Sequence, residues 1–96
     1  MIVLITYDVC TSEEDGAGRL RRVARICLNY GIRVQKSVFE CKVTPSQRVV
    51  LEDSLRKVID PEKDSIRIYD LGDIPANRII HMGTCRPIDL EGTLIF

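Results

Sequence analysis

The 96-residue chain has no tryptophan, one histidine and no two cysteines in Cys-x-x-Cys spacing. A zinc site needs several cysteine or histidine ligands at short spacings, and a nucleophilic triad needs a histidine with partners. His81 lies in an alternating stretch without an indicated partner, and the four cysteines form no disulfide framework. These absences argue against a zinc centre and against triad catalysis.

Long apolar runs and glycine-rich loops are also missing. No run is long enough to span a membrane, and the run at Ile2–Ile5 is too short for a signal peptide and has no basic segment before it. We therefore expect a cytoplasmic protein without membrane contact. The six glycines form no phosphate-binding loop, and a 96-residue chain with 45% apolar residues suits one small domain, residues 1–96.

Acidic residues are absent from Gly16 to Phe39, although the formal net charge of the whole chain is zero. The same stretch carries six basic residues: Arg19, Arg21, Arg22, Arg25, Arg33 and Lys36. Arginine outnumbers lysine ten to four, and its planar guanidinium suits phosphate recognition. The stretch is either a nucleic-acid-binding surface or a solvated helix face, which is the usual role of a charge cluster.

The chain begins with an apolar run, Ile2–Thr6, that leads into Tyr7 and Asp8. Such a run predicts a central strand buried on both faces, with Asp8 at its carboxyl end. A carboxylate there either caps a turn or serves as a metal ligand or catalytic acid. Tyr7, like Phe39 further on, either stacks on bases or packs in the core.

Helical periodicity follows in two places. The first predicted helix covers about residues 15–29 and ends at Gly31, which suits a left-handed cap. Its buried stripe is Leu20, Val23, Ala24, Cys27 and Leu28. The second begins with a capping box of Thr44 and Gln47 and runs to about Ile59. Its stripe is Val50, Leu51, Leu55, Val58 and Ile59.

Extended segments separate these helices. Residues 32–43 predict two short strands broken near Lys36–Ser37, and residues 65–71 and 78–82 predict two more strands. The order is β-α-β-β-α-β with an additional C-terminal strand, which indicates an α+β, ferredoxin-like antiparallel sheet. Right-handed connections place both helices on one face of this sheet. The other face then needs a cover, and a homodimer would supply it and bring two Asp8 carboxylates together.

Two carboxylates at such an interface suit a hard cation. Mg²⁺, or Mn²⁺ as the alternative, commonly binds through one or two carboxylates and substrate phosphates. The residues therefore favour a metal-dependent hydrolase acting on a phosphate-bearing substrate, with Asp8 as both metal ligand and catalytic residue. The arginine-rich stretch supports a rival function as a DNA-binding scaffold, and it disfavours a regulatory module that binds a small metabolite.

The sequence resembles the small Cas-two proteins of CRISPR adaptation modules along essentially the whole chain. The similar segments are Tyr7-Asp8-Val9, Arg19–Ala24, Gly31–Cys41, Ile59-Asp60-Pro61, Asp64–Tyr69 and Asp89–Phe96. The last of these resembles the branch found beside type I-C effector genes. Tyr-Asp combined with Arg-Val-Gln-x-Ser-Val-Phe-Glu is highly specific, whereas either half alone is weak.

This resemblance implies a ferredoxin-like homodimer in which the strand and tail of residues 77–96 pair with the other protomer. It implies a metal-dependent endonuclease acting on double-stranded DNA or single-stranded RNA through Asp8. It also implies a place in spacer integration, with the Cas-one integrase as partner. Arg22, Arg33 and Phe39 match functional positions of the family, and Arg19 or Arg21 replaces a family arginine that falls on Leu20.

Overall fold

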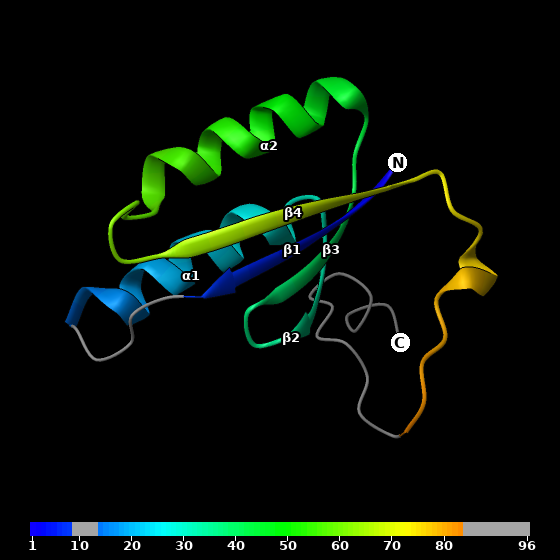
Figure 1. Ribbon diagram of the computed structural model, residues 1–96, viewed down its shortest axis with the longest axis horizontal. Helices are drawn as coiled ribbons and strands as arrows, with labels where there is room; N and C mark the ends of the chain where they lie inside the picture. Colours follow the sequence, from blue (N-terminus) through cyan, green and yellow to red (C-terminus); the bar gives the residue numbers. More distant parts are fainter. Residues whose placement is uncertain (9–13, 84–96) are drawn as a thin grey trace.

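The computed structural model describes residues 1–8 and 14–83, except for the side chains of residues 14, 15 and 76. The described chain forms an α+β domain whose elements follow the predicted order (Figure 1). The elements are β1 (Ile2–Asp8), α1 (Glu14–Leu28), β2 (Gly31–Gln35), β3 (Val38–Lys42), α2 (Pro45–Val58), β4 (Ser65–Gly72) and a 3-10 helix (Ala76–Arg78).

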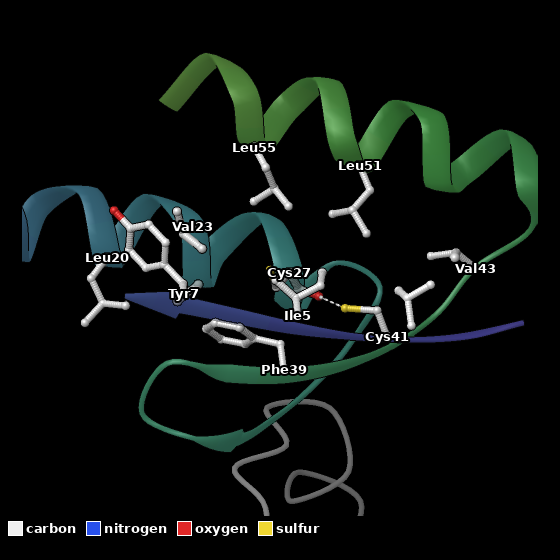
Figure 2. Close-up of a cluster of buried hydrophobic side chains, with 12 residues drawn as sticks. Ile5, Tyr7, Leu20, Val23, Cys27, Phe39, Cys41, Val43, Leu51 and Leu55 are labelled. Carbon is white, nitrogen blue, oxygen red and sulfur yellow. Dashed lines mark hydrogen bonds between the residues drawn. The ribbon is translucent and has the colours of Figure 1, made fainter. Parts of the chain in front are cut away.

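The four strands form one sheet in the order β2-β3-β1-β4, and each neighbouring pair is antiparallel. β1 is therefore central, as predicted, and β4 and β2 are the two edges. Both helices pack against the same face, where side chains of α1, α2, β1 and β3 meet in a single apolar core (Figure 2). We call the opposite face, which neither helix covers, the open face.

Burial along β1 alternates strictly. Val3, Ile5 and Tyr7 are buried toward the helices, whereas Ile2 and Leu4 are half-buried on the open face. The prediction of a strand buried on both faces is therefore wrong for the single chain. The reason is that this sheet carries helices on one side only, so a run that is apolar at every position leaves half of its side chains uncovered.

The second helix starts where its sequence predicts. Thr44 accepts a hydrogen bond from the Gln47 backbone N–H at 3.1 Å, and the Gln47 side chain accepts one from the Thr44 N–H at 2.9 Å. This reciprocal pair satisfies two backbone donors that the first turn leaves free. Leu51 and Leu55 are fully buried, but Val50 is 54% exposed, so its placement on the buried stripe is wrong.

Gly31 serves a different purpose from the predicted cap. Its φ angle is not positive, and it is the first residue of β2. A Cβ atom at this position would lie 2.6 Å from the Cα of Cys41, and still closer to the carbonyl oxygen of Glu40. Glycine is therefore required by the close approach of β2 to β3 rather than by a left-handed turn.

The strand predicted at residues 78–82 is also absent from the structure. After β4 the chain forms the short 3-10 helix and then runs without ladder partners to Gly83. A strand needs a neighbour for its backbone groups, and this stretch has none among residues 1–8 and 14–83. The predictions for residues 84–96 lie outside the described residues.

Candidate active site

Asp8 ends β1 and is exposed. It pairs with Ser65 at the beginning of β4. Because side chains alternate along a strand, Asp8 shares the open face with Leu4 and Thr6. The carboxylate therefore stands at one end of the face that the helices leave uncovered.

Arg67 is the nearest basic neighbour of Asp8 on this face by strand register. It pairs with Thr6, two residues before Asp8, so the two side chains occupy diagonal positions of the β1–β4 ladder. Such positions lie about 7–8 Å apart, within reach of a long side chain. The Arg67 guanidinium also lies 5.4 Å from the centre of the Tyr69 ring. A carboxylate, a guanidinium and an aromatic ring thus line one strip of the open face.

On the other face, behind Asp8, lies a network of buried polar groups. The Asp64 carboxylate accepts a hydrogen bond from the Tyr7 hydroxyl at 2.7 Å and from Arg19 Nε at 2.8 Å. Both of these bonds are to Oδ2, which also accepts one from the Asp60 backbone N–H at 2.9 Å. The other oxygen, Oδ1, accepts a fourth hydrogen bond from Arg19 Nη2 at 3.2 Å. The side chain of Asp64 is fully buried and that of Arg19 is 7% exposed. We call Tyr7, Arg19 and Asp64 the buried network.

The surroundings shift the pKa values of this network in opposite directions. Burial by itself would raise the pKa of Asp64, but hydrogen bonds from Arg19, the Asp60 backbone and Tyr7 outweigh it and lower that pKa. Burial, together with the hydrogen bond to Asp64, raises the pKa of Tyr7 to about 12. The network therefore holds an ionised carboxylate and a neutral phenol.

Three of the residues predicted to contact nucleic acid are buried. Phe39 is completely inaccessible in the core, and the Tyr7 ring, 2% exposed, points from β1 toward α1 (Figure 2). Arg19 is tied to Asp64. Base stacking by Tyr7 or Phe39 has no support in this conformation, since neither ring offers a face to a ligand. Both residues instead pack in the core, which is the other alternative that the sequence left open.

The other predicted arginines lie nearer to solvent. Arg22 is exposed on α1, together with Arg21 and Arg25. Arg33 is half-buried, with its guanidinium 5.5 Å from the centre of the Phe39 ring, and its Nε donates to the Lys36 carbonyl at 2.7 Å. Their roles in binding stay predictions, but Arg22 is free to meet a phosphate whereas Arg33 is partly held by its own strand and turn.

Sequence reasoning missed Asp64 and Arg67. Nothing near Asp64 in the sequence marks it as buried, because its partners come from β1 and α1. Arg19 did carry a signal. It lies four residues before Val23 and eight before Cys27, which is the spacing of the buried stripe.

The oxygen atoms of Asp8 can supply only part of the coordination shell of a hard divalent cation. A carboxylate oxygen is a suitable ligand for Mg²⁺ or Mn²⁺. Among the described side chains, which exclude those of residues 14 and 15, no three acids, cysteines or histidines cluster as a metal cage. Asp8 would thus hold a metal only together with further ligands, such as a second Asp8 or substrate phosphates.

Comparison with known proteins decides the family. Residues 1–79 match the family model described as CRISPR associated protein Cas2. The chain belongs to the Cas2 family. The matched residues include β1 with Asp8, the buried network and the strip of Arg67 and Tyr69, so the geometry described above lies within the family domain.

Full-length relatives share about half of the residues. The CRISPR-associated endoribonuclease Cas2 of Chlorobaculum tepidum is 54% identical over 95 residues, covering 99% of each chain. The CRISPR-associated endonuclease Cas2 of Halalkalibacterium halodurans is 54% identical over all of both chains. The crystal structure of Streptococcus pyogenes Cas2 at pH 6.5 superposes with a TM-score of 0.78 at 49% identity, covering 86% of this chain and 100% of that one. The fold is thus that of solved Cas2 proteins.

No helix among the described residues has the length and apolar character needed to cross a bilayer.

Proposed function

We propose that this Cas2-family chain is a metal-dependent endonuclease that works as a ferredoxin-like homodimer with Asp8 of each protomer at a shared site. The observation that carries the proposal is the position of Asp8, an exposed carboxylate at one end of the sheet face that neither helix covers. The names of the relatives, endoribonuclease in one case and endonuclease in the other, support phosphodiester cleavage as the reaction class.

The open face is suited to association with a second copy. Its β1 and β3 positions include the half-buried aliphatic side chains of Ile2, Leu4 and Val38, and Tyr69 and Leu71 of β4 are at least 40% exposed. At the amino end of β1, Met1, Ile2, Pro75 and Ile79 help line an apolar groove of about 480 Å³. Exposed apolar surface of this kind marks an interaction site, and a two-fold contact would repeat Asp8 across it. Residues 77–96 would add further contacts, by strand pairing with the other protomer.

In such a dimer the residues of the chain have separate tasks. The two Asp8 carboxylates would supply the oxygen ligands for Mg²⁺ or Mn²⁺. When bound, that cation would polarise the scissile phosphate and acidify the attacking water. Arg67 would approach a non-bridging phosphate oxygen from the adjacent strand, because a guanidinium binds phosphate in a fixed, bidentate geometry. Double-stranded DNA and single-stranded RNA both carry the group that this arrangement would bind.

The test is cleavage of labelled double-stranded DNA and single-stranded RNA with and without Mg²⁺ or Mn²⁺. We expect metal-dependent cutting by the wild type and its loss in Asp8→Asn, a change that keeps the shape of the side chain and removes its charge. Asp53→Asn is the matched control, because Asp53 is an exposed acid of α2 far along the chain from Asp8. An Asp8→Asn protein that retained full activity would overturn the proposal.

A second function rests on a separate observation, the exposed arginines of α1. Arg21, Arg22 and Arg25 point to solvent, and no ion pair to them occurs among the described residues. Unneutralised guanidinium groups on one helix suit the phosphates of a DNA duplex. We propose that the dimer also serves as a non-catalytic DNA-binding scaffold that bridges dimers of the Cas-one integrase in the cytoplasm during spacer integration. The type I-C-like branch is the setting that the ending Asp89–Phe96 favours.

A further inference from the structure

The buried network touches all three segments that meet around Asp8. Tyr7 immediately precedes Asp8 in β1. Asp64 immediately precedes Ser65, the residue of β4 that pairs with Asp8. Arg19 belongs to α1, the first helix after Asp8. Side chains from two of these segments, Tyr7 of β1 and Arg19 of α1, thus both donate to the carboxyl group of Asp64 in the third.

Stability alone is a poor explanation for this arrangement. Removing an aspartate and an arginine from water is costly, and well-packed apolar side chains of the same volume are often as stable or more so. The network does, however, impose a unique geometry, because the Asp64 carboxylate accepts four hydrogen bonds from three different parts of the chain. No buried side-chain nitrogen or oxygen in the described part of the chain lacks a partner.

The buried network lies directly beside Asp8, the residue proposed to be catalytic. Tyr7 and Asp8 are neighbours in a strand, so their side chains point to opposite faces and are joined by one rigid peptide unit. Holding the Tyr7 ring through its hydroxyl therefore restrains the backbone from which the Asp8 side chain projects to the opposite face. Asp8 is the last residue of its strand, where the ladder by itself would allow fraying.

We infer that Tyr7, Arg19 and Asp64 form a positioning network that sets the placement of the Asp8 carboxylate on the open face. The inference deepens the proposed nuclease function and rests on it. Asp64 is the centre of the network, and Arg19 neutralises and orients its carboxylate. Tyr7, which donates to Asp64, connects the network to Asp8 through the backbone of β1. None of the three touches the substrate.

The test compares Tyr7→Phe and Asp64→Asn with the wild type. Tyr7→Phe removes one hydroxyl and keeps the ring, whereas Asp64→Asn removes the charge that Arg19 faces. Displacement of a reacting group by about 1 Å can lower a rate by roughly a hundredfold. We expect kcat to fall about tenfold for Tyr7→Phe and about a hundredfold for Asp64→Asn, with KM for the nucleic acid unchanged.

The matched control is Asp70→Asn. Asp70 is also an acid of β4 paired with an arginine, Arg48, at 2.7 Å, but this ion pair is partly exposed and lies at the opposite end of the strand. We expect Asp70→Asn to leave kcat and KM unchanged. Assays are run well below the melting temperature of every variant, so that loss of folded protein cannot lower kcat.

A second readout does not depend on activity. In the NMR spectrum of the full chain, Tyr7→Phe should shift the amide signals of Asp8 and Ser65 and speed their hydrogen exchange, whereas Asp70→Asn should not. A merely structural network would lower the melting temperature without changing kcat at low temperature. If Asp8→Asn is inactive while Tyr7→Phe cleaves at the wild-type rate with unshifted Asp8 and Ser65 signals, the positioning role is overturned and the nuclease function stands. If Asp8→Asn is fully active, the nuclease function itself fails.

Discussion

Asp64 combines a fully buried side chain with a negative charge. Its side chain is fully buried, yet its pKa is lowered, because hydrogen bonds to the ionised form outweigh the cost of burial. In the unfolded chain an aspartate has a pKa of about 3.9. A group whose pKa is lower in the folded state stabilises that state above the unfolded pKa, and the stabilisation is lost as pH falls through the folded value.

This linkage predicts an acid-sensitive melting temperature. From pH 7 down to about 4 the wild type should melt well above Asp64→Asn, and the difference between them should shrink as the pH falls below about 4. Asp53→Asn, which changes an exposed acid, should instead follow the wild-type curve. Thermal melts followed by circular dichroism at each pH supply the comparison. A wild-type advantage that stayed constant down to pH 2 would contradict a depressed pKa at Asp64.

Single-residue roles were the hardest part to read from the sequence. Asp8 was identified from its place after an apolar strand, and the structure leaves it exposed. Tyr7, Arg19 and Phe39 were assigned to nucleic acid, but they are buried. A local pattern reports which side chains are polar or aromatic, whereas burial depends on partners such as Asp64 that lie more than forty residues away.

The element that best separates the two proposed functions is α1. Its buried side is apolar except for Arg19, and its exposed arginines belong to a stretch free of acids from Gly16 to Phe39. Because each neutralised phosphate releases counterions, the salt dependence of DNA binding counts these contacts.

Charge reversal on α1 should therefore weaken DNA binding without affecting the fold. For Arg21→Glu/Arg22→Glu we expect a loss of affinity and a smaller slope of log K against log salt, by roughly one unit for each lost contact. Arg56→Glu, an exposed arginine of α2, is the control. Fluorescence anisotropy with a labelled duplex at several salt concentrations measures both quantities. Equal affinity and slope in the double variant and the wild type would exclude α1 from the DNA interface.

The positions of helices and strands were predicted far better than the roles of single residues. The capping box at Thr44 and the break at Lys36–Ser37 are confirmed, because caps and turns are set by neighbouring residues. The strand predicted at residues 78–82 does not form within the described single chain, since an alternating apolar pattern cannot show whether a hydrogen-bonding neighbour exists there. The apolar pattern of β1 is present, but it does not mean full burial, because the helices cover only one face of the sheet and leave Ile2 and Leu4 half-buried.

At the scale of the whole molecule, the open face joins these observations. The helices cover one side of the sheet, and the other side presents aliphatic residues, the strip of Arg67 and Tyr69, and Asp8 at the strand end. The proposed dimer accounts for the apolar content of that face, and it would supply a second Asp8 carboxylate to the site. The central claim is therefore that the active site consists of two Asp8 carboxylates from two chains.

The most direct measurement of this claim is cleavage by mixtures of wild-type and Asp8→Asn protein after subunit exchange, at constant total protein. If both carboxylates are required, activity follows the square of the wild-type fraction, so an equal mixture retains about one quarter of the activity. If each protomer cleaves independently, the equal mixture retains about one half. The account predicts the square; a linear decline, or activity in pure Asp8→Asn, would contradict it.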